Sequence, residues 1–120
     1  MAASEQVKKI TEIAAQAIAD KLGYDIVALD MTEQLLLSEV FLIATGASER
    51  QVDAIAEAVF EKLAAFGEKP VRKEGKGQWL LLDYSDLVVH IQTEELRGYY
   101  MLDRLWNDCA RIPLDIEETR

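Results

Sequence analysis

Apolar residues recur every three or four positions in three stretches of the chain, which is the spacing of a helix with one buried face. The first two stretches cover residues 4–23 and 48–67, and each begins with a serine suited to an N-cap and ends with a glycine suited to C′. The third follows Thr93, a possible cap, and includes the helix-weakening Gly98. Its apolar positions are Leu96, Tyr99, Tyr100, Leu102, Leu105 and Trp106.

Five further stretches are rich in aliphatic and β-branched residues and predict strands. They are residues 24–30, 40–45, 70–74, 78–84 and 87–92. The run at 40–45 is apolar on both alternations, as expected for a strand covered on both faces. With the helix at 48–67 and the strand at 70–74 it predicts a βαβ unit and a partly parallel sheet. The order as a whole predicts an α/β fold with a mixed sheet of about five strands and flanking helices.

The runs at 78–84 and 87–92 are separated by Ser85-Asp86 alone, which predicts an antiparallel hairpin. Alternate residues of its first strand point to opposite faces, Trp79, Leu81 and Asp83 to one and Leu80, Leu82 and Tyr84 to the other. If the second set packs on the helices, Trp79 and Leu81 point outward, an arrangement typical of a protein-binding hot spot. The alternative is a core position for Trp79, because tryptophan is mostly buried.

The size and charge of the chain narrow the choice of function. Its 120 residues, half of them apolar, predict a single domain, which we place at residues 1–115, with a flexible acidic tail at 116–120. With 22 acidic and 13 basic residues the net charge is −9, which disfavours binding to nucleic-acid phosphates and favours a basic protein partner. We find no export signal, and no apolar run approaches the roughly 20 residues that cross a bilayer, so a cytoplasmic location is expected.

Gly46-Ala47-Ser48 lies between a strand and a helix start, where free backbone N–H groups favour an anion such as phosphate. This turn carries the alternative function, a nucleotide-binding or nucleotidyltransferase-related activity. It lacks the Gly-Lys-Ser/Thr ending of a Walker loop and the three-glycine dinucleotide fingerprint. A tight turn followed by a capping box between Ser48 and Gln51 is the favoured interpretation.

Four other polar residues are candidates for chemistry, but none predicts a catalytic, metal or cofactor site. Asp83 and Asp86 flank a turn, and aspartates in that position more often bond within the turn than hold magnesium. His90 has no nucleophile or orienting acid nominated by the sequence, so a hydrogen-bonded histidine is favoured over a general base. Cys109, the single cysteine, cannot form an internal disulfide and is interpreted as inert.

Three segments of the chain resemble the ribosomal silencing factor S family, also called Iojap-related. They are residues 44–52 (ATGASERQV), 79–91 (WLLLDYSDLVVHI) and 100–106 (YMLDRLW). The resemblance runs in order from about Ile10 to Asp115, and the hairpin motif with the later Leu-Trp is its most specific part. The chain departs from the pattern at Ser38-Glu39, where the family usually has an aspartate, which puts any role of that aspartate in doubt.

The resemblance implies a fold related to the nucleotidyltransferase superfamily without its activity, and the chain contains no Asp-x-Asp pair for magnesium. It also implies a homodimer when free. The family binds the large ribosomal subunit through a ribosomal protein at the subunit-joining face, the fourteenth of the large-subunit series. Occupying that face prevents docking of the small subunit and lowers translation when nutrients are scarce.

Carried over to matching positions, the resemblance centres the contact surface on Trp79, Leu81 and Asp83. Three further residues match the motif as either contact or fold residues, and the sequence leaves that choice open. They are Tyr84, Asp86 and His90.

Overall fold

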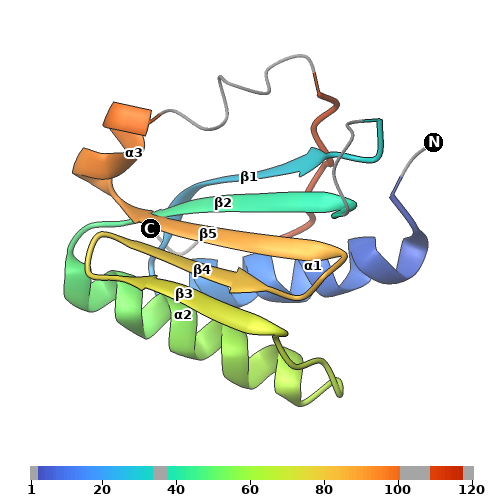
Figure 1. The fold of residues 1–120 in the computed structure, drawn as a ribbon, viewed down its shortest axis with the longest axis horizontal. Coiled ribbons are helices and arrows are strands. Elements are labelled where there is room, and N and C mark those ends of the chain that lie inside the picture. Colours follow the sequence, from blue (N-terminus) through green and yellow to red (C-terminus); the bar gives the residue numbers. More distant parts are fainter. Residues whose placement is uncertain (1–2, 34–37, 101–108, 118–120) are drawn as a thin grey trace.

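A computed structural model describes residues 3–33, 38–100 and 109–117 of the chain. Figure 1 shows a twisted sheet with two long helices on one side and a short helix beyond one end. The elements are α1 (Glu5–Asp20), β1 (Tyr24–Asp30), β2 (Val40–Gly46), α2 (Glu49–Ala64), β3 (Arg72–Lys76), β4 (Trp79–Asp83), β5 (Leu87–Thr93) and α3 (Glu94–Tyr100). None of the helices in these described ranges is long and apolar enough to span a membrane.

The five strands form one mixed sheet in the order β1-β2-β5-β4-β3, which confirms the predicted α/β class and the strand number. β2 and β5 pair in parallel, and the other neighbours are antiparallel, including the predicted β4–β5 hairpin. β2 and β3, which α2 connects, run in the same direction, but β5 and β4 lie between them. The βαβ prediction was therefore right about the relative direction of β2 and β3, but these two strands are not neighbours in the sheet.

The strand predicted at 70–74 is wrong by two residues, because β3 begins at Arg72 and ends at Lys76. Gly75, just after the predicted strand, lies within β3 opposite Leu80 at a positive φ of 86°. A Cβ at this position would overlap the backbone carbonyl of Trp79. Glycine is needed here for the close approach of two strands rather than for a turn.

The main core lies between α1 and α2 and the sheet face toward them. α1 contributes a run of small side chains, including Ala14 and Ala15, which are fully buried. Small side chains let α1 lie close to α2 and to the sheet. The sheet contributes alternate residues of its central strands, Val40, Leu42, Ala44, Leu87, Val89 and Ile91, with Leu82 of β4.

The predicted helix starts are confirmed, and one helix end differs by a residue. The Ser4 hydroxyl accepts a hydrogen bond from the Val7 amide at 3.3 Å and caps α1. At the other end Leu22, not Gly23, takes the left-handed conformation, with φ of 65°. Gly23 donates its amide to the Ile18 carbonyl at 2.9 Å, and a Cβ on it would clash with the Ile18 side chain. This closes the helix as a Schellman motif shifted by one position.

The capping box at the start of α2 is also displaced. The Gln51 amide donates to the Ser48 hydroxyl at 3.1 Å as predicted, but the Gln51 side chain accepts from the amide of Ala47 at 2.7 Å instead of that of Ser48. Its Nε2 group donates to the carbonyl of Lys21 at 2.9 Å. Gln51 thus ties the start of α2 to the end of α1. Gly67, with φ of 82°, ends α2 as predicted.

The chain after residue 108 packs along β1 and α1. The Asp30 amide donates to the Ala110 carbonyl and the Ile112 amide to the Ala28 carbonyl, both at 2.8 Å. Ile116, the first residue of the expected tail, packs against the main core, and Glu117 donates its amide to Gln16 at 2.9 Å. The cap of the third helix is confirmed, since the Leu96 amide donates to the Thr93 hydroxyl at 3.4 Å. The apolar positions predicted at 102, 105 and 106 lie outside the described residues.

Candidate functional site

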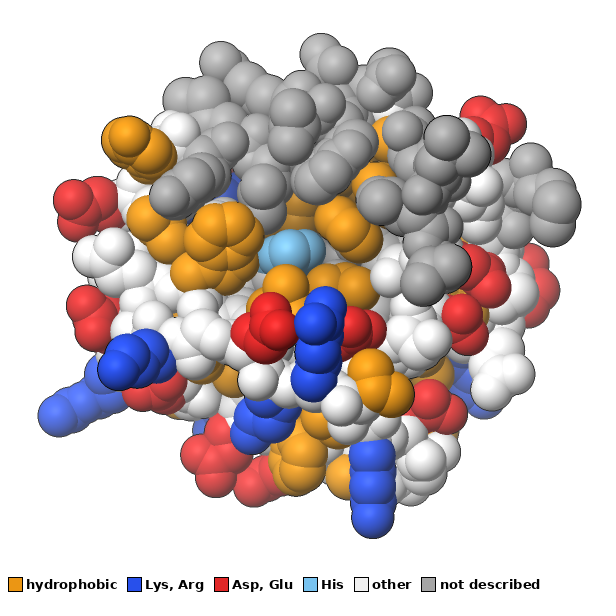
Figure 2. All heavy atoms as spheres, in the orientation of Figure 1, with side chains coloured by type: hydrophobic (Ala, Val, Ile, Leu, Met, Phe, Trp, Pro, Cys, Tyr) orange, Lys and Arg blue, Asp and Glu red, His pale blue; other side chains and the backbone are white. Residues whose placement is uncertain are grey.

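The sheet face opposite α1 and α2 carries the hairpin residues singled out from the sequence. Leu80, Leu82 and Tyr84 pack in the main core, so Trp79, Leu81 and Asp83 lie on the other face, as the strand alternation required. Figure 2 views this face, where hydrophobic side chains gather around the single histidine. The described residues of its second apolar cluster are Val27, Leu29, Met31, Phe41, Ile43, Trp79 and Cys109. Trp79 and Leu81 are half-buried, neither sealed in the core nor fully exposed.

The Trp79 indole contacts the imidazole of His90. Its Nε1 group donates a hydrogen bond to His90 Nδ1 at 3.3 Å, and the two ring centroids are 6.0 Å apart with an interplanar angle of 50°. On β2, Phe41 also packs against the imidazole, with centroids 5.0 Å apart at 55°. These tilted contacts are favourable aromatic geometries. The imidazole therefore lies between two aromatic side chains at the centre of the face.

His90 is buried and uncharged at neutral pH. Its exposed fraction is 7%, and burial lowers the pKa of its imidazole to about 4. Its Nδ1 atom accepts from Trp79, whereas its Nε2 atom has no hydrogen-bond partner among the described residues. The expectation of a hydrogen-bonded histidine holds for one of its two nitrogens. The described contacts bring no nucleophile to it.

A small charged cluster borders the exposed side of Leu81. The Arg72 guanidinium contacts Asp83 Oδ2 at 3.1 Å and Glu74 Oε1 at 3.0 Å. The other Asp83 oxygen accepts from the Ser85 amide at 2.8 Å, so Asp83 also stabilises the hairpin turn. This is the role that the sequence favoured over magnesium binding. Next to this cluster is a shallow hollow of about 320 Å³, lined by Glu74, Gly75, Lys76, Trp79 and Leu81.

Tyr84 and Asp86 are not brought together with Trp79. Tyr84 is buried in the main core on the helix side, and burial followed by the charge of Glu68 raises the pKa of its phenol to about 12. Asp86 is exposed at the hairpin turn, and its backbone carbonyl accepts from the amides of Glu39 and Val40. Within the described ranges, no group of three or more histidine, cysteine or acidic residues is placed to hold a metal ion.

The turn at Gly46–Ser48 has the surroundings of a helix cap and not of a phosphate site. A Cβ on Gly46 would lie 3.0 Å from the Val52 side chain, so the glycine serves close packing at the start of α2. The hollow beside the turn, of about 430 Å³, is lined by three glutamates together with uncharged residues, Ala47, Ser48, Glu49, Gln78, Thr93, Glu94 and Glu95. Carboxylates at this density repel a phosphate group.

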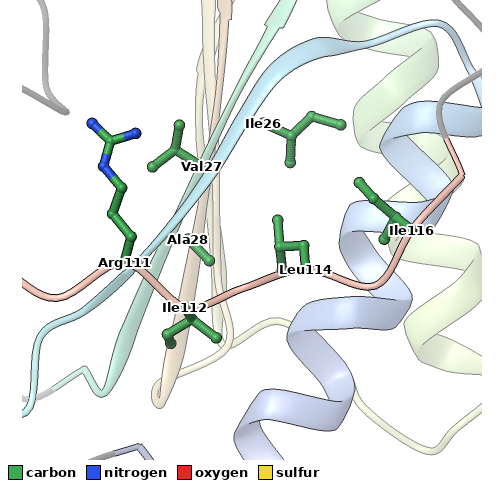
Figure 3. A pocket seen from close by; sticks show the side chains of 7 residues that line it. All are labelled: Ile26, Val27, Ala28, Arg111, Ile112, Leu114 and Ile116. Atoms are coloured by element: carbon green, nitrogen blue, oxygen red, sulfur yellow. The ribbon is translucent and has the colours of Figure 1, made fainter.

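A groove that sequence reasoning missed lies between β1 and the chain after residue 108 (Figure 3). It has a volume of about 490 Å³ and an apolar lining apart from one cation: Ile26, Val27, Ala28, Arg111, Ile112, Leu114 and Ile116. Ile26, Leu114 and Ile116 point toward one another, and Arg111 points away from them. The alternation of apolar residues at 112, 114 and 116 was the signal that could have revealed it. Among the described residues the lining holds no acid or nucleophile, so this part of the groove offers packing surface rather than chemistry.

Comparison with known proteins identifies the family. The model of the family described as "Ribosomal silencing factor during starvation" matches residues 4–120. The chain is 40% identical over 110 residues to the ribosomal silencing factor RsfS of Bacillus subtilis, covering 90% of this chain and 93% of that protein. The chain belongs to the ribosomal silencing factor family. The chloroplastic protein Iojap of Zea mays is 31% identical over 88% of this chain and 47% of its own length.

The fold of this family member agrees with a solved structure. A crystal structure of a protein from Chromobacterium violaceum superposes with a TM-score of 0.81 at 34% identity, covering 95% of this chain and 96% of that one. The Glu39 carboxylate accepts a hydrogen bond from the Ser4 amide at 2.8 Å. In this chain the residue therefore anchors the start of α1.

Proposed function

We propose that this silencing factor is a translational repressor that binds the large ribosomal subunit and sterically blocks association with the small subunit. The partner is a ribosomal protein at the subunit-joining face, the fourteenth of the large-subunit series. Membership of a family named for ribosomal silencing during starvation supports the proposal. The net charge of −9 also supports it, because a basic ribosomal protein is a better electrostatic partner for this chain than bare RNA.

The observation that carries the proposal is the half-buried Trp79–Leu81 pair on the sheet face away from α1 and α2. The shallow hollow between this pair and β3 offers a place for a partner side chain. Tryptophan side chains in such positions dominate many protein interfaces. Asp83 and Glu74 share a single arginine, so this border retains acceptor capacity for a basic group of the partner.

The three further motif residues have different roles in this proposal. Asp86 is exposed at the end of the hairpin and lies within reach of a partner that covers the hairpin. Tyr84 is assigned to the fold, because it lies in the core under the sheet. His90 is assigned to the binding surface indirectly, because its contact is with Trp79.

Two finer parts of the proposal concern assembly and ancestry. We propose that the free protein is a homodimer, which light scattering after size-exclusion chromatography would measure. We also propose kinship with the nucleotidyltransferases without their activity. The glutamates lining the hollow at Ser48 support the loss of activity, since they disfavour a triphosphate there.

Replacement of Trp79 by alanine tests the proposed surface. Truncating a central interface tryptophan costs at least about 2 kcal/mol, or about thirty-fold in affinity. Trp79→Ala is therefore expected to abolish co-sedimentation with purified large subunits while the protein keeps its native circular dichroism spectrum. The matched control is Phe66→Ala, which removes an aromatic side chain that is 55% exposed at the end of α2, away from this face. Undiminished co-sedimentation of Trp79→Ala would refute the surface.

A further inference from the structure

The position of His90 in the sheet places its imidazole next to the indole of Trp79. His90 lies opposite Leu81 on β4 and opposite Ile43 on β2, on the sheet face away from α1 and α2. Trp79 is two residues from Leu81 on β4, so its indole reaches His90 diagonally across the strand pair. Diagonal neighbours on one face of an antiparallel pair are within reach of aromatic side chains.

The hydrogen bond between the two side chains has one possible direction. An indole Nε1 group is only a donor, so His90 Nδ1 must be an unprotonated acceptor at the 3.3 Å separation observed. Phe41 packs on the same imidazole from β2 and limits its rotation. The imidazole is thus fixed between β2 and β4, and the indole is fixed to the imidazole.

We infer that His90 is a positioning residue of the binding surface, holding the Trp79 indole in the orientation that a protein partner contacts. This inference rests on the proposed function of the Trp79 surface. A side chain that is already ordered does not lose rotamer freedom on binding, whereas a free one does. Loss of the hydrogen bond should therefore weaken binding by about 2- to 10-fold, less than loss of the indole itself.

Two substitutions of His90 separate the acceptor from the bulk of the side chain. His90→Asn places an amide oxygen where Nδ1 lies and can keep the bond to the indole. His90→Leu is of similar size and has no acceptor. The position of the indole is read from the Trp79 Nε1–H signal in a nitrogen–proton correlation spectrum, assigned with Trp79→Phe, because the chain has two tryptophans. Affinity is measured by titration with purified large ribosomal subunits.

The expected result is that His90→Leu shifts the Trp79 indole signal, speeds its solvent exchange and weakens subunit binding by about 2- to 10-fold. His90→Asn should retain the signal and most of the affinity. An unchanged indole signal in His90→Leu would overturn the inference, and so would a shifted signal with unchanged affinity. If His90→Leu fails to fold, His90→Asn decides, because loss of binding with the indole signal intact would show that His90 itself contacts the partner.

The outcomes also separate this inference from the proposed function. If Trp79→Ala binds subunits normally, the proposed surface is wrong. If Trp79→Ala loses binding and His90→Leu does not, the surface stands and the positioning role of His90 fails.

Discussion

Two adjacent leucines of β4 give a direct test of which sheet face is covered. Leu82 is 1% exposed and packs in the main core, whereas Leu81 is half-buried on the opposite face. Leu82→Ala leaves a cavity under the sheet and should lower the free energy of unfolding by about 3 kcal/mol. Leu81→Ala removes the same atoms from a partly exposed position and should cost less than about 1 kcal/mol. The same substitution at neighbouring positions thus differs several-fold in its effect on stability.

Urea unfolding followed by circular dichroism measures both changes. With a slope of about 1.5 kcal/mol per molar, Leu82→Ala should lower the urea midpoint by about 2 M, and Leu81→Ala by well under 1 M. Co-sedimentation with large subunits should show the reverse order, because Leu81 lies on the proposed binding surface. Equal destabilisation by the two substitutions would contradict the one-sided burial of β4 on which the proposed function depends.

Two further predictions concern buried polar groups. Because the pKa of His90 is about 4 in the folded chain and about 6.5 when unfolded, the unfolded state takes up a proton first as the pH falls. The free energy of unfolding should therefore drop by about 1.5 kcal/mol between pH 6.5 and 5 and level off only below about pH 4. Urea midpoints for His90→Asn should lack this part of the pH dependence. Arg97 donates from Nη1 to the Thr45 hydroxyl at 2.8 Å in a buried position. Thr45→Val should lower the free energy of unfolding by about 1.5 kcal/mol. Thr11→Val should lower it by less, because the Thr11 hydroxyl bonds a carbonyl of its own helix. Similar melting temperatures for the two variants would argue against the Arg97 bond.

The hairpin and its two faces could be predicted because they depend on local rules. Strand alternation assigns Trp79 and Leu82 to opposite faces, and the short Ser85-Asp86 turn fixes antiparallel pairing. Which face meets the helices depends on tertiary packing, so the sequence left it conditional. The end of α1 was misplaced by one residue, because Gly23 is required by the nearness of Ile18 and not by its own φ.

The links between distant segments could not be predicted from local patterns. The contact of Trp79 with His90 depends on the register of β4 against β5, which places these two residues diagonally across the strand pair. The position of β3 depends on how closely Gly75 approaches Trp79. The packing of residues 109–117 was not predicted, although the alternating apolar residues at 112, 114 and 116 were a visible signal for it.

The backbone bonds that join Asp30 to Ala110 and Ala28 to Ile112 affect how the chain folds as it is made. Until residues 110–112 have been synthesised, the outer side of β1 has no strand to pair with. An unpaired strand edge invites association with other nascent chains. This step of folding therefore waits until residues 110–112 have been made, and variants that weaken this late contact should reduce the yield of monodisperse protein more than they lower its melting temperature.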